Sequence, residues 1–282
     1  MIGDQVATLL GAKVAGVTAL GTGSGGTGAY RVALLSGENV FAKAYPGDAP
    51  GFLAAEARGL RWLREADGVA VPEVLGETED LLVTTWITPG RATPSGAEDF
   101  GRQLATVHAR GAQSFGAPWD GYIGALPMSN AESDEWPSFY AERRVLPYLR
   151  AAVDRKALDL SQAADIERVC ARIEELAGPP ELPARLHGDL WAGNLQWDVR
   201  GRAWLIDPAA HGGHRETDLA MLALFAPPQL ETILGAYDEV HPLDDGWRER
   251  VGLHQLHPLL VHAALFGGSY GEQAHAAAHQ YL

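Results

Sequence analysis

The chain has 282 residues, 46% of them apolar, and a formal net charge of −14. This length and composition allow a large core, arranged as one domain or two, and we expect two lobes. The negative charge disfavours nucleic acid and anionic membranes as partners, so we expect neither, and it favours a small neutral or cationic substrate.

The cysteine content and the apolar runs limit where the protein works. A lone cysteine, Cys170, allows no internal disulfide and is expected in a helical core. No run approaches the ~20 apolar residues of a membrane span, and the first residues lack the pattern of a secretory signal. We therefore expect a cytoplasmic protein. Its oligomeric state stays open, with a monomer favoured.

The first part of the chain predicts a small sheet with two helices. Apolar residues at helical spacing predict a helix over 5–14. Extended segments after a glycine-rich stretch, joined by a turn at 36–39, predict an antiparallel meander. A second helix is predicted over 52–65 and a buried strand over 81–87. A hinge is expected near 84–90, where a proline and a glycine close the strand.

Helical spacing dominates the rest of the chain. The exception runs from 185–197 to 203–208 and predicts a loop followed by a hairpin. The sequence therefore predicts an α+β fold with a small antiparallel-sheet N-lobe over 1–88 and a larger, mainly helical C-lobe over 89–282. The predicted helices of this C-lobe span 96–110, 134–153, 161–177, 216–226, 228–240 and 246–265.

The glycine-rich stretch GTGSGG at 21–26 has the G-x-G-x-x-G spacing of phosphate-binding loops. A dinucleotide-binding fold needs a helix directly after these glycines, whereas residues Tyr30 to Leu35 predict a strand. A glycine-rich loop between antiparallel strands is how protein kinases cover nucleotide phosphates with backbone N–H groups. A plain flexible hairpin stays open as an alternative, because glycine serves any tight turn.

Lys43 and Glu56 form a candidate ion pair near this loop. Lys43 shares a strand face with Phe41 and Tyr45, and Glu56 shares a helical face with apolar residues. An unpaired buried charge is costly, so a pair that holds the lysine ready for an anionic ligand is the economical interpretation. Both side chains could instead lie at the surface with only their stems buried.

The segment RLHGDLWAGNLQW at 185–197 crowds polar groups among apolar residues. If the following hairpin turns through two residues, Arg200 and Gly201, then Asn194 faces Asp207 across it. Their oxygen atoms would converge where a hard cation such as Mg²⁺ could bind.

The spacing D-x-x-x-x-N from Asp189 to Asn194 is that of the kinase catalytic loop. There the aspartate receives the hydroxyl proton and the asparagine holds metal. Asp207 ends an apolar strand 13 residues after Asn194, as a metal-binding aspartate should. Singly, Asp189 could be a turn residue, Asn194 a cap and His187 a core histidine. Their order along the chain, together with Lys43 and the glycine-rich loop, favours a kinase-like site.

Six segments extend this pattern over nearly the whole chain: YIGALPMSN (122–130), WPSFYAERRVLPYL (136–149), HGDLWAGN (187–194), IDPA (206–209), GHRETDLAMLALF (213–225) and HQLHPLLVHAALFGGSY (254–270). Together they resemble the fructosamine (ketosamine) kinase family, within the wider aminoglycoside-phosphotransferase-like, protein-kinase-like fold. The wider superfamily typically has proline before the Gly-Asn of the catalytic loop. Here Leu190-Trp191 and the following Ala192 take the ketosamine-kinase form.

The resemblance implies ATP-dependent phosphorylation of the sugar 3-hydroxyl of ketosamines, the rearranged products of amine glycation, either free or on proteins. Release of the amine would follow. It implies ATP and Mg²⁺ as cofactors, with Asp189 as the catalytic base and Asn194 and Asp207 on the metal. The residues expected on the nucleotide are Gly23, Ser24, Gly25, Gly26, Lys43 backed by Glu56, and the hinge residues Thr85, Trp86 and Ile87.

The resemblance also points to residues of the substrate pocket. Trp191 offers an aromatic face to the amine-bearing chain of the substrate, although it could equally be a core wedge. His262 could reach the sugar, and Asp218 is expected to cap the next helix and brace the catalytic loop. Three further candidates stand where a kinase has its activation segment: His214, Arg215 and Glu216.

Two departures from the family pattern bear on these expectations. His211-Gly212 stands where the family usually has aromatic residues, which leaves the shape of the substrate pocket open. The hinge reads Thr84-Thr85-Trp86 where an acidic residue is common. That difference should matter less, because adenine is typically held by backbone groups of the hinge.

Two other functions stay open. One is a kinase for another hydroxylated amine, such as an aminoglycoside or a choline-like metabolite. The other is a nucleotide-binding scaffold without catalysis, against which the intact set of Lys43, Asp189, Asn194 and Asp207 argues.

Overall fold

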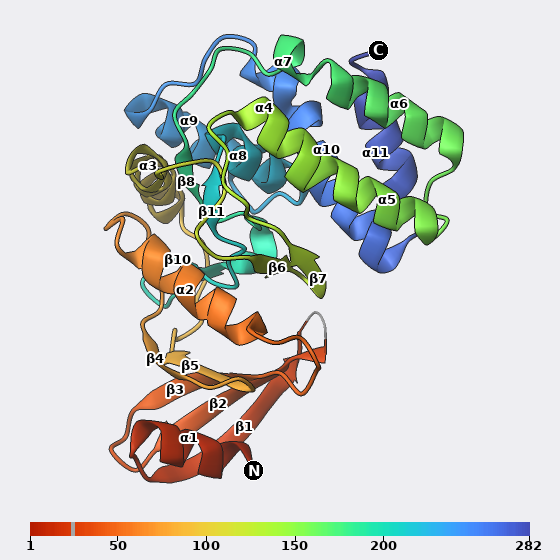
Figure 1. The fold of residues 1–282 in the computed structure, drawn as a ribbon. Coiled ribbons are helices and arrows are strands. Elements are labelled where there is room, and N and C mark those ends of the chain that lie inside the picture. The colour runs from red at the N-terminus through yellow and green to blue at the C-terminus, as the bar shows by residue number, and fades with distance from the viewer. Residues whose placement is uncertain (24–25) are drawn as a thin grey trace.

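The computed structural model describes residues 1–23 and 26–282 (Figure 1). A five-stranded antiparallel sheet with two helices lies at one end, and a larger body of helices lies at the other. The predicted α+β architecture with a sheet-rich and a helical lobe is thus present. The division at residues 88 and 89 stays a prediction, because one hydrophobic cluster includes residues from both sides of it, such as Leu60 and Leu104.

The sheet takes the strand order β1-β2-β3-β5-β4. Its elements are α1 (Ile2–Leu10), β1 (Val14–Thr22), β2 (Gly28–Leu34), β3 (Asn39–Ala44), α2 (Phe52–Arg64), β4 (Val74–Glu77) and β5 (Leu81–Thr85). The predicted first helix, over 5–14, is displaced: α1 begins at Ile2 and ends where Gly11 takes a left-handed conformation, with φ of 61°. Val14, the last residue of the predicted helix, already belongs to β1.

The alternation of side chains along β3 explains why a lysine lies inside the protein. Val40 and Ala42 point to one face, where they pack with Val6 of α1. Because successive residues of a strand point to opposite faces, Lys43 points to the other face with Phe41, as predicted. That face looks toward α2, whose helix brings Glu56 opposite Lys43.

The helical body follows the predicted pattern with three differences. The segment predicted over 161–177 is broken at Arg172, a helix near the C-terminus was not expected, and a π-helical stretch (Tyr140–Val145) joins two helices predicted as one. Cys170 is buried, as expected. The helices are α3 (Pro94–Ala109), α4 (Trp136–Phe139), α5 (Leu146–Asp154), α6 (Leu160–Ala171), α7 (Ile173–Leu176), α8 (Arg215–Leu224), α9 (Leu230–Val240), α10 (Trp247–Phe266) and α11 (Tyr270–His279).

Three two-stranded pairs lie in the segments between these helices. The pairs are β6 (Gly121–Ile123) with β7 (Leu126–Met128), β8 (Ala184–Leu186) with β11 (His211–Gly213), and β9 (Leu195–Trp197) with β10 (Ala203–Leu205). No helix in the described parts of the chain is both long and apolar enough to cross a membrane.

The register of the β9–β10 hairpin differs from the predicted one. Leu195 pairs with Leu205, so Asn194 lies opposite Ile206 and not opposite Asp207. The turn is longer than two residues because Asp198 closes it: its Oδ1 accepts hydrogen bonds from the N–H groups of Arg200 and Arg202. Asp207 therefore lies one residue beyond the partner of Asn194.

The contact between α3 and α9 provides a test of this packing. A Cβ atom on Gly101 of α3 would lie 2.2 Å from the carbonyl oxygen of Ile233, whereas one on Gly235 of α9 would meet nothing within 4 Å. We expect Gly101→Ala to lower the free energy of unfolding by ~1–3 kcal/mol through overpacking. Gly235→Ala should raise it by ~0.5–1 kcal/mol, because alanine favours the helix. Denaturant unfolding of both variants measures the difference, and equal stabilities would contradict this packing.

Candidate active site

Lys43 lies between two carboxylates that come from different parts of the fold. Its Nζ is 2.8 Å from Glu56 Oε2 and 2.5 Å from Asp207 Oδ1. β3 carries the lysine, α2 carries Glu56, and Asp207 follows β10. The predicted Lys43–Glu56 pair is thus present, and the alternative of two surface residues is wrong, since the side chains are only 9% and 11% exposed.

Burial and charge determine how these three groups titrate. Burial disfavours the charged form of Lys43, but the carboxylates of Glu56 and Asp207 outweigh it and raise the pKa of the amine. Burial raises the pKa of Glu56 to about 8, although Lys43 opposes this. Burial acts in the same direction on Asp207, yet Lys43 holds the pKa of Asp207 below its usual range. Because the side chain of Asp207 is 42% exposed, it is the carboxylate that keeps its charge.

The loop before β9 is held by a buried carboxylate. Asp218 of α8 accepts hydrogen bonds from the backbone N–H groups of His187, at 2.7 Å, and Gly188, at 2.9 Å. His108 Nε2 of α3 lies 3.2 Å from the same carboxylate. The predicted bracing role of Asp218 is confirmed. Its predicted capping role is wrong, because the side chain that accepts a hydrogen bond at the start of α8 is that of His214.

His187 and Gly188 fix the path of the backbone into Asp189. The Nδ1 of His187 accepts the Asp189 N–H at 3.2 Å, so its Nε2 carries the proton and donates to Ile206 O at 2.9 Å. Burial lowers the pKa of His187, which favours this neutral form. Gly188 has φ of 79°, and a Cβ there would lie 2.1 Å from Ala209 O, so only glycine fits.

Asp189 and Asn194 contact each other directly. The Nδ2 of Asn194 donates to the carbonyl oxygen of Asp189 at 2.8 Å and to its Oδ2 at 2.9 Å. The backbone carbonyl can only accept, which fixes the orientation of the amide and turns its oxygen away from Asp189. Burial raises the pKa of Asp189 to about 7, with the charge of Asp207 adding to this and the Asn194 hydrogen bond opposing it.

Two cavities meet at this group and share Lys43, Glu56 and Asp207. The first, which we call the hinge cavity, has a volume of about 260 Å³ and includes Gly23, Phe41, Leu60, Thr84, Thr85, Trp86, Ile87 and Ile206 in its wall. The second, the Asp189 cavity, includes Asp189, Phe52, Trp119, Tyr122, Met128 and Pro208. The predicted hinge residues and Gly23 therefore line one cavity. Ser24 and Gly25 lie outside the described residues, and Gly26 is not in the wall of this cavity.

Trp191 and His262 belong to one group of aromatic rings. The ring of Trp191 lies 6.2 Å from that of Phe225, which lies 4.8 Å from His262, and His262 lies 5.0 Å from Tyr270. We call these four residues the aromatic platform. Trp191 is 39% exposed, so it is not a core wedge. A Cβ on Gly193 would lie 2.3 Å from its ring, which explains the neighbouring glycine.

The three activation-segment candidates are not brought to either cavity. Arg215 donates to Glu181 and to the carbonyl oxygens of His241 and Pro242, and Glu216 accepts two hydrogen bonds from Arg250. The reason is that α8 is enclosed by its neighbours, with residues 215–222 all buried. His214, Arg215 and Glu216 therefore act in the structure of the helical body, and the expectation that they line the substrate pocket is corrected.

The β6–β7 hairpin supplies residues that the sequence did not single out as part of the site. Tyr122 and Met128 line the Asp189 cavity, and Trp119 precedes the hairpin. The hydroxyl of Tyr122 donates to Pro50 O at 3.0 Å, which ties the hairpin to the start of α2. Strands of three residues are too short for their periodicity to be seen, and only the family-like segment YIGALPMSN marked this region.

Comparison with known proteins places this geometry in a family. Residues 4–282 match the family model for fructosamine kinase. A protein of Enterococcus faecium named "probable ketoamine kinase" is 34% identical over 236 residues, which are 83% of this chain and 84% of that protein. The crystal structure of a fructosamine-3-kinase candidate from Thermobifida fusca is 50% identical, with a TM-score of 0.94 over 99% of this chain and 97% of that one.

A more distant structure has the same fold. The macrolide 2'-phosphotransferase from Brachybacterium faecium superposes with a TM-score of 0.63 over 97% of this chain and 96% of that one, at 17% identity. At this identity the likeness shows the fold alone. The predicted protein-kinase-like fold and an ATP-dependent phosphotransferase acting on a hydroxyl group are both confirmed. The chain belongs to the fructosamine kinase family.

Proposed function

We propose that the protein phosphorylates the 3-hydroxyl of ketosamines with ATP and Mg²⁺, and that the phosphorylated product then releases its amine. The observation that carries this proposal is that Lys43 and Asp207 line both cavities, while Asp189, which Asn194 contacts, lines one of them. The hinge cavity suits a nucleotide. Asp189 lines the other cavity, where the hydroxyl group of a substrate can reach it. Because the reaction consumes ATP, we place it in the cytoplasm.

The nucleotide is proposed to occupy the hinge cavity. Its wall between Phe41, Leu60 and Ile206 is apolar and suits a flat base. Thr85, Trp86 and Ile87 also line it. Because the N–H of Thr85 already donates to Glu73 O, the backbone proposed to hydrogen-bond the base is that of Trp86 and Ile87. Lys43, at the inner end, meets the phosphates. The glycine-rich loop, with Gly23, Ser24, Gly25 and Gly26, is proposed to cover them with backbone N–H groups.

The donor set of Asn194 and Asp207 fits Mg²⁺. The Asn194 nitrogen is engaged by Asp189, which leaves its oxygen for a cation. Asp207, whose side chain is 42% exposed, offers a carboxylate oxygen as a second ligand. Mg²⁺ prefers few protein oxygens with phosphate and water around them. When bound, the ion neutralises charge on the phosphates, which is what phosphoryl transfer mostly needs.

Asp189 is proposed to accept the proton of the substrate hydroxyl. A pKa of about 7 leaves much of the carboxylate ionised at neutral pH and makes it a better proton acceptor than an ordinary aspartate. Asn194 holds the carboxylate through Oδ2, so the other oxygen is free to meet the hydroxyl. Positioning of the hydroxyl in line with the phosphate is the larger part of the rate enhancement.

The aromatic platform is proposed to receive the amine-bearing arm of the substrate. Trp191 is two residues from Asp189, and its exposed ring can stack on an aliphatic chain or a cationic amine. Phe225 lies between the rings of Trp191 and His262 and contacts both. His262 is the proposed contact for the sugar. The net charge of −14 also favours cationic amines over anionic ones.

Turnover on defined substrates tests the proposal. We expect consumption of ATP with small ribulosamines or fructosamines in the presence of Mg²⁺, and a loss of kcat of ~10³-fold or more in Asp189→Asn, which keeps the shape but cannot accept the proton. A parallel panel of aminoglycosides and choline-like amines provides the comparison. Turnover on that panel alone would transfer the substrate assignment to another hydroxylated amine, and nucleotide binding without turnover would indicate a scaffold.

The raised pKa of Asp189 predicts how activity varies with pH. If the ionised carboxylate is the base, kcat/KM should fall about tenfold per pH unit below about 7. A flat profile between pH 5 and ~7 would contradict this role.

The pH dependence of the protein's melting temperature reports the pKa of Asp189 without any measurement of turnover. A carboxyl whose folded pKa is raised contributes stability below its ordinary pKa, and this is lost as the pH rises through about 7. Asp189→Asn should therefore melt at a higher temperature than the wild type at pH ~8 and at the same temperature near pH ~4. Equal melting temperatures at both pH values would show that the carboxyl has no raised pKa.

Substitution of Trp191 separates binding of the amine arm from the chemical step. We expect Trp191→Leu to raise KM for a ketosamine with a long amine arm by ~10-fold, with a smaller change in kcat, because stacking is lost while Asp189 stays in place. Trp191→Phe should recover most of the affinity. Steady-state kinetics of the two variants decide the role, and equal KM values for all three proteins would exclude it.

A further inference from the structure

We infer that Asp165, His275 and His279 form a binding site for a Zn²⁺-type divalent transition metal between α6 and α11. This site is independent of the proposed function. It lies in the helical body, away from the five-stranded sheet (Figure 1). Imidazole nitrogens combined with one carboxylate are the donor set that zinc takes in sites with an open fourth position.

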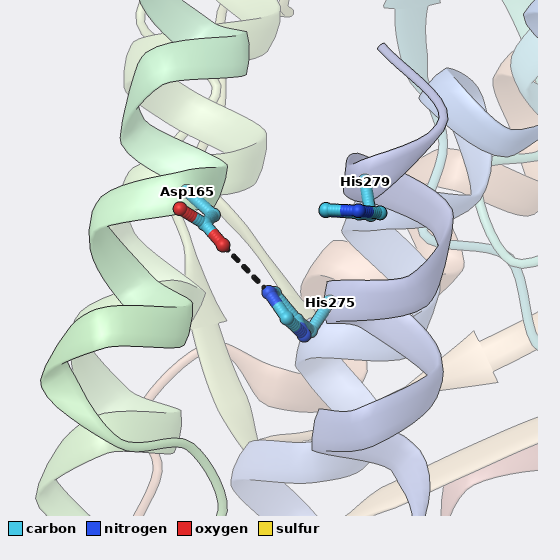
Figure 2. A group of neighbouring side chains, drawn as sticks. All are labelled: Asp165, His275 and His279. Atoms are coloured by element: carbon cyan, nitrogen blue, oxygen red, sulfur yellow. Dashed lines mark hydrogen bonds and ion pairs between the residues drawn. The ribbon is translucent and has the colours of Figure 1, made fainter. Parts of the chain in front are cut away.

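The two histidines are spaced for a common ligand. His275 and His279 are one helical turn apart on α11, and their ring centroids lie 6.0 Å from each other. Residues at i and i+4 share a helical face, so both imidazoles project from the same side. Figure 2 shows the side chains of His275 and His279 one after the other along α11, with His275 turned toward Asp165 of α6.

Asp165 supplies the third ligand from the facing helix. Its Oδ2 lies 2.8 Å from His275 Nε2, and one ligand atom from each of the three residues lies within 4.8 Å of the others (Figure 2). Ligands of a tetrahedral zinc ion with bonds of ~2.0–2.1 Å are ~3.3 Å apart. An ion in place of the hydrogen bond therefore requires only small rotations of the side chains.

The surroundings leave the site accessible and its carboxylate charged. The side chains of Asp165 and His275 are 18% and 28% exposed, and His279 is exposed, so a water molecule can complete the coordination. A hydrogen bond from His275 lowers the pKa of Asp165, and the nearby guanidinium of Arg168 adds to this. Arg168 lies 2.6 Å from Asp165 Oδ1 and competes with a cation for this carboxylate.

A second group of possible ligands in the described part of the chain does not suit a metal. His214, Glu216 and His254 also lie close together, but all three are buried. Arg250 already donates to both oxygens of Glu216, at 2.9 Å and 2.5 Å. A cation there would have to displace a buried arginine, whereas the ion between α6 and α11 displaces a partly exposed hydrogen bond and competes with the exposed Arg168.

Calorimetric titration of the full-length, untagged protein with Zn²⁺ tests the site. Millimolar Mg²⁺ is present throughout to occupy sites that prefer oxygen ligands. We expect one zinc ion per chain with micromolar affinity, and an increase of at least ~10-fold in Kd for His279→Ala and for Asp165→Asn. Arg168→Gln should lower Kd, because it removes the competing cation. Glu167→Gln, on the same helix with the same change of charge as Asp165→Asn, is the control and should bind like the wild type.

Cobalt provides an independent readout of the ligands. Co²⁺ in the wild type should give the intense visible absorption of a four-coordinate site, which His279→Ala loses. His279→Ala should keep the circular dichroism and the kinase turnover of the wild type, since His279 is exposed and lies on α11. The inference is overturned if the wild type binds no zinc, or if His279→Ala and Asp165→Asn bind it as tightly as the wild type does.

Discussion

The position of Lys43 between Glu56 and Asp207 is the interaction on which the rest of the site depends. It joins β3, α2 and the end of β10 through one cation, at 2.8 Å and 2.5 Å. A buried lysine needs these carboxylates, because a charge without a partner is costly inside a protein. Because Lys43 has two carboxylate partners, it can give up one of them and keep the other. In the proposed function, Lys43 would turn to the anionic phosphates while Asp207 binds a cation.

The loop that carries Asp189 is held by a second buried carboxylate, that of Asp218. Asp218 fixes the N–H groups of His187 and Gly188, and His108 connects it to α3. The helices of the larger lobe therefore determine where Asp189 points. In the proposed function, the nucleotide lies against the sheet and the catalytic base is held by the helices, so the two parts of the fold would meet at the phosphate.

How much the sequence predicts depends on whether the signal is local. The apolar face around Glu56 is a pattern within one helix, and it predicted a buried carboxylate. A buried carboxylate needs a cation, and this predicted the pair with Lys43. The hairpin register was missed because the Asp198 side chain closes a longer turn, which no periodicity reveals. Glu216 was predicted to line the substrate pocket because it stands where a kinase has its activation segment. Its partner Arg250 lies 34 residues away, so only the packed helices show that the charge is neutralised inside the protein.

The central claim is that the group around Asp189 transfers phosphate to one particular hydroxyl of a ketosamine. Phosphorus and proton NMR of the reaction product with a fructosamine measure this directly. The account predicts a phosphate ester whose phosphorus couples to the proton on C3 of the sugar, followed by release of the free amine. A phosphate on any other carbon, or inorganic phosphate from ATP with an unmodified ketosamine, would contradict it.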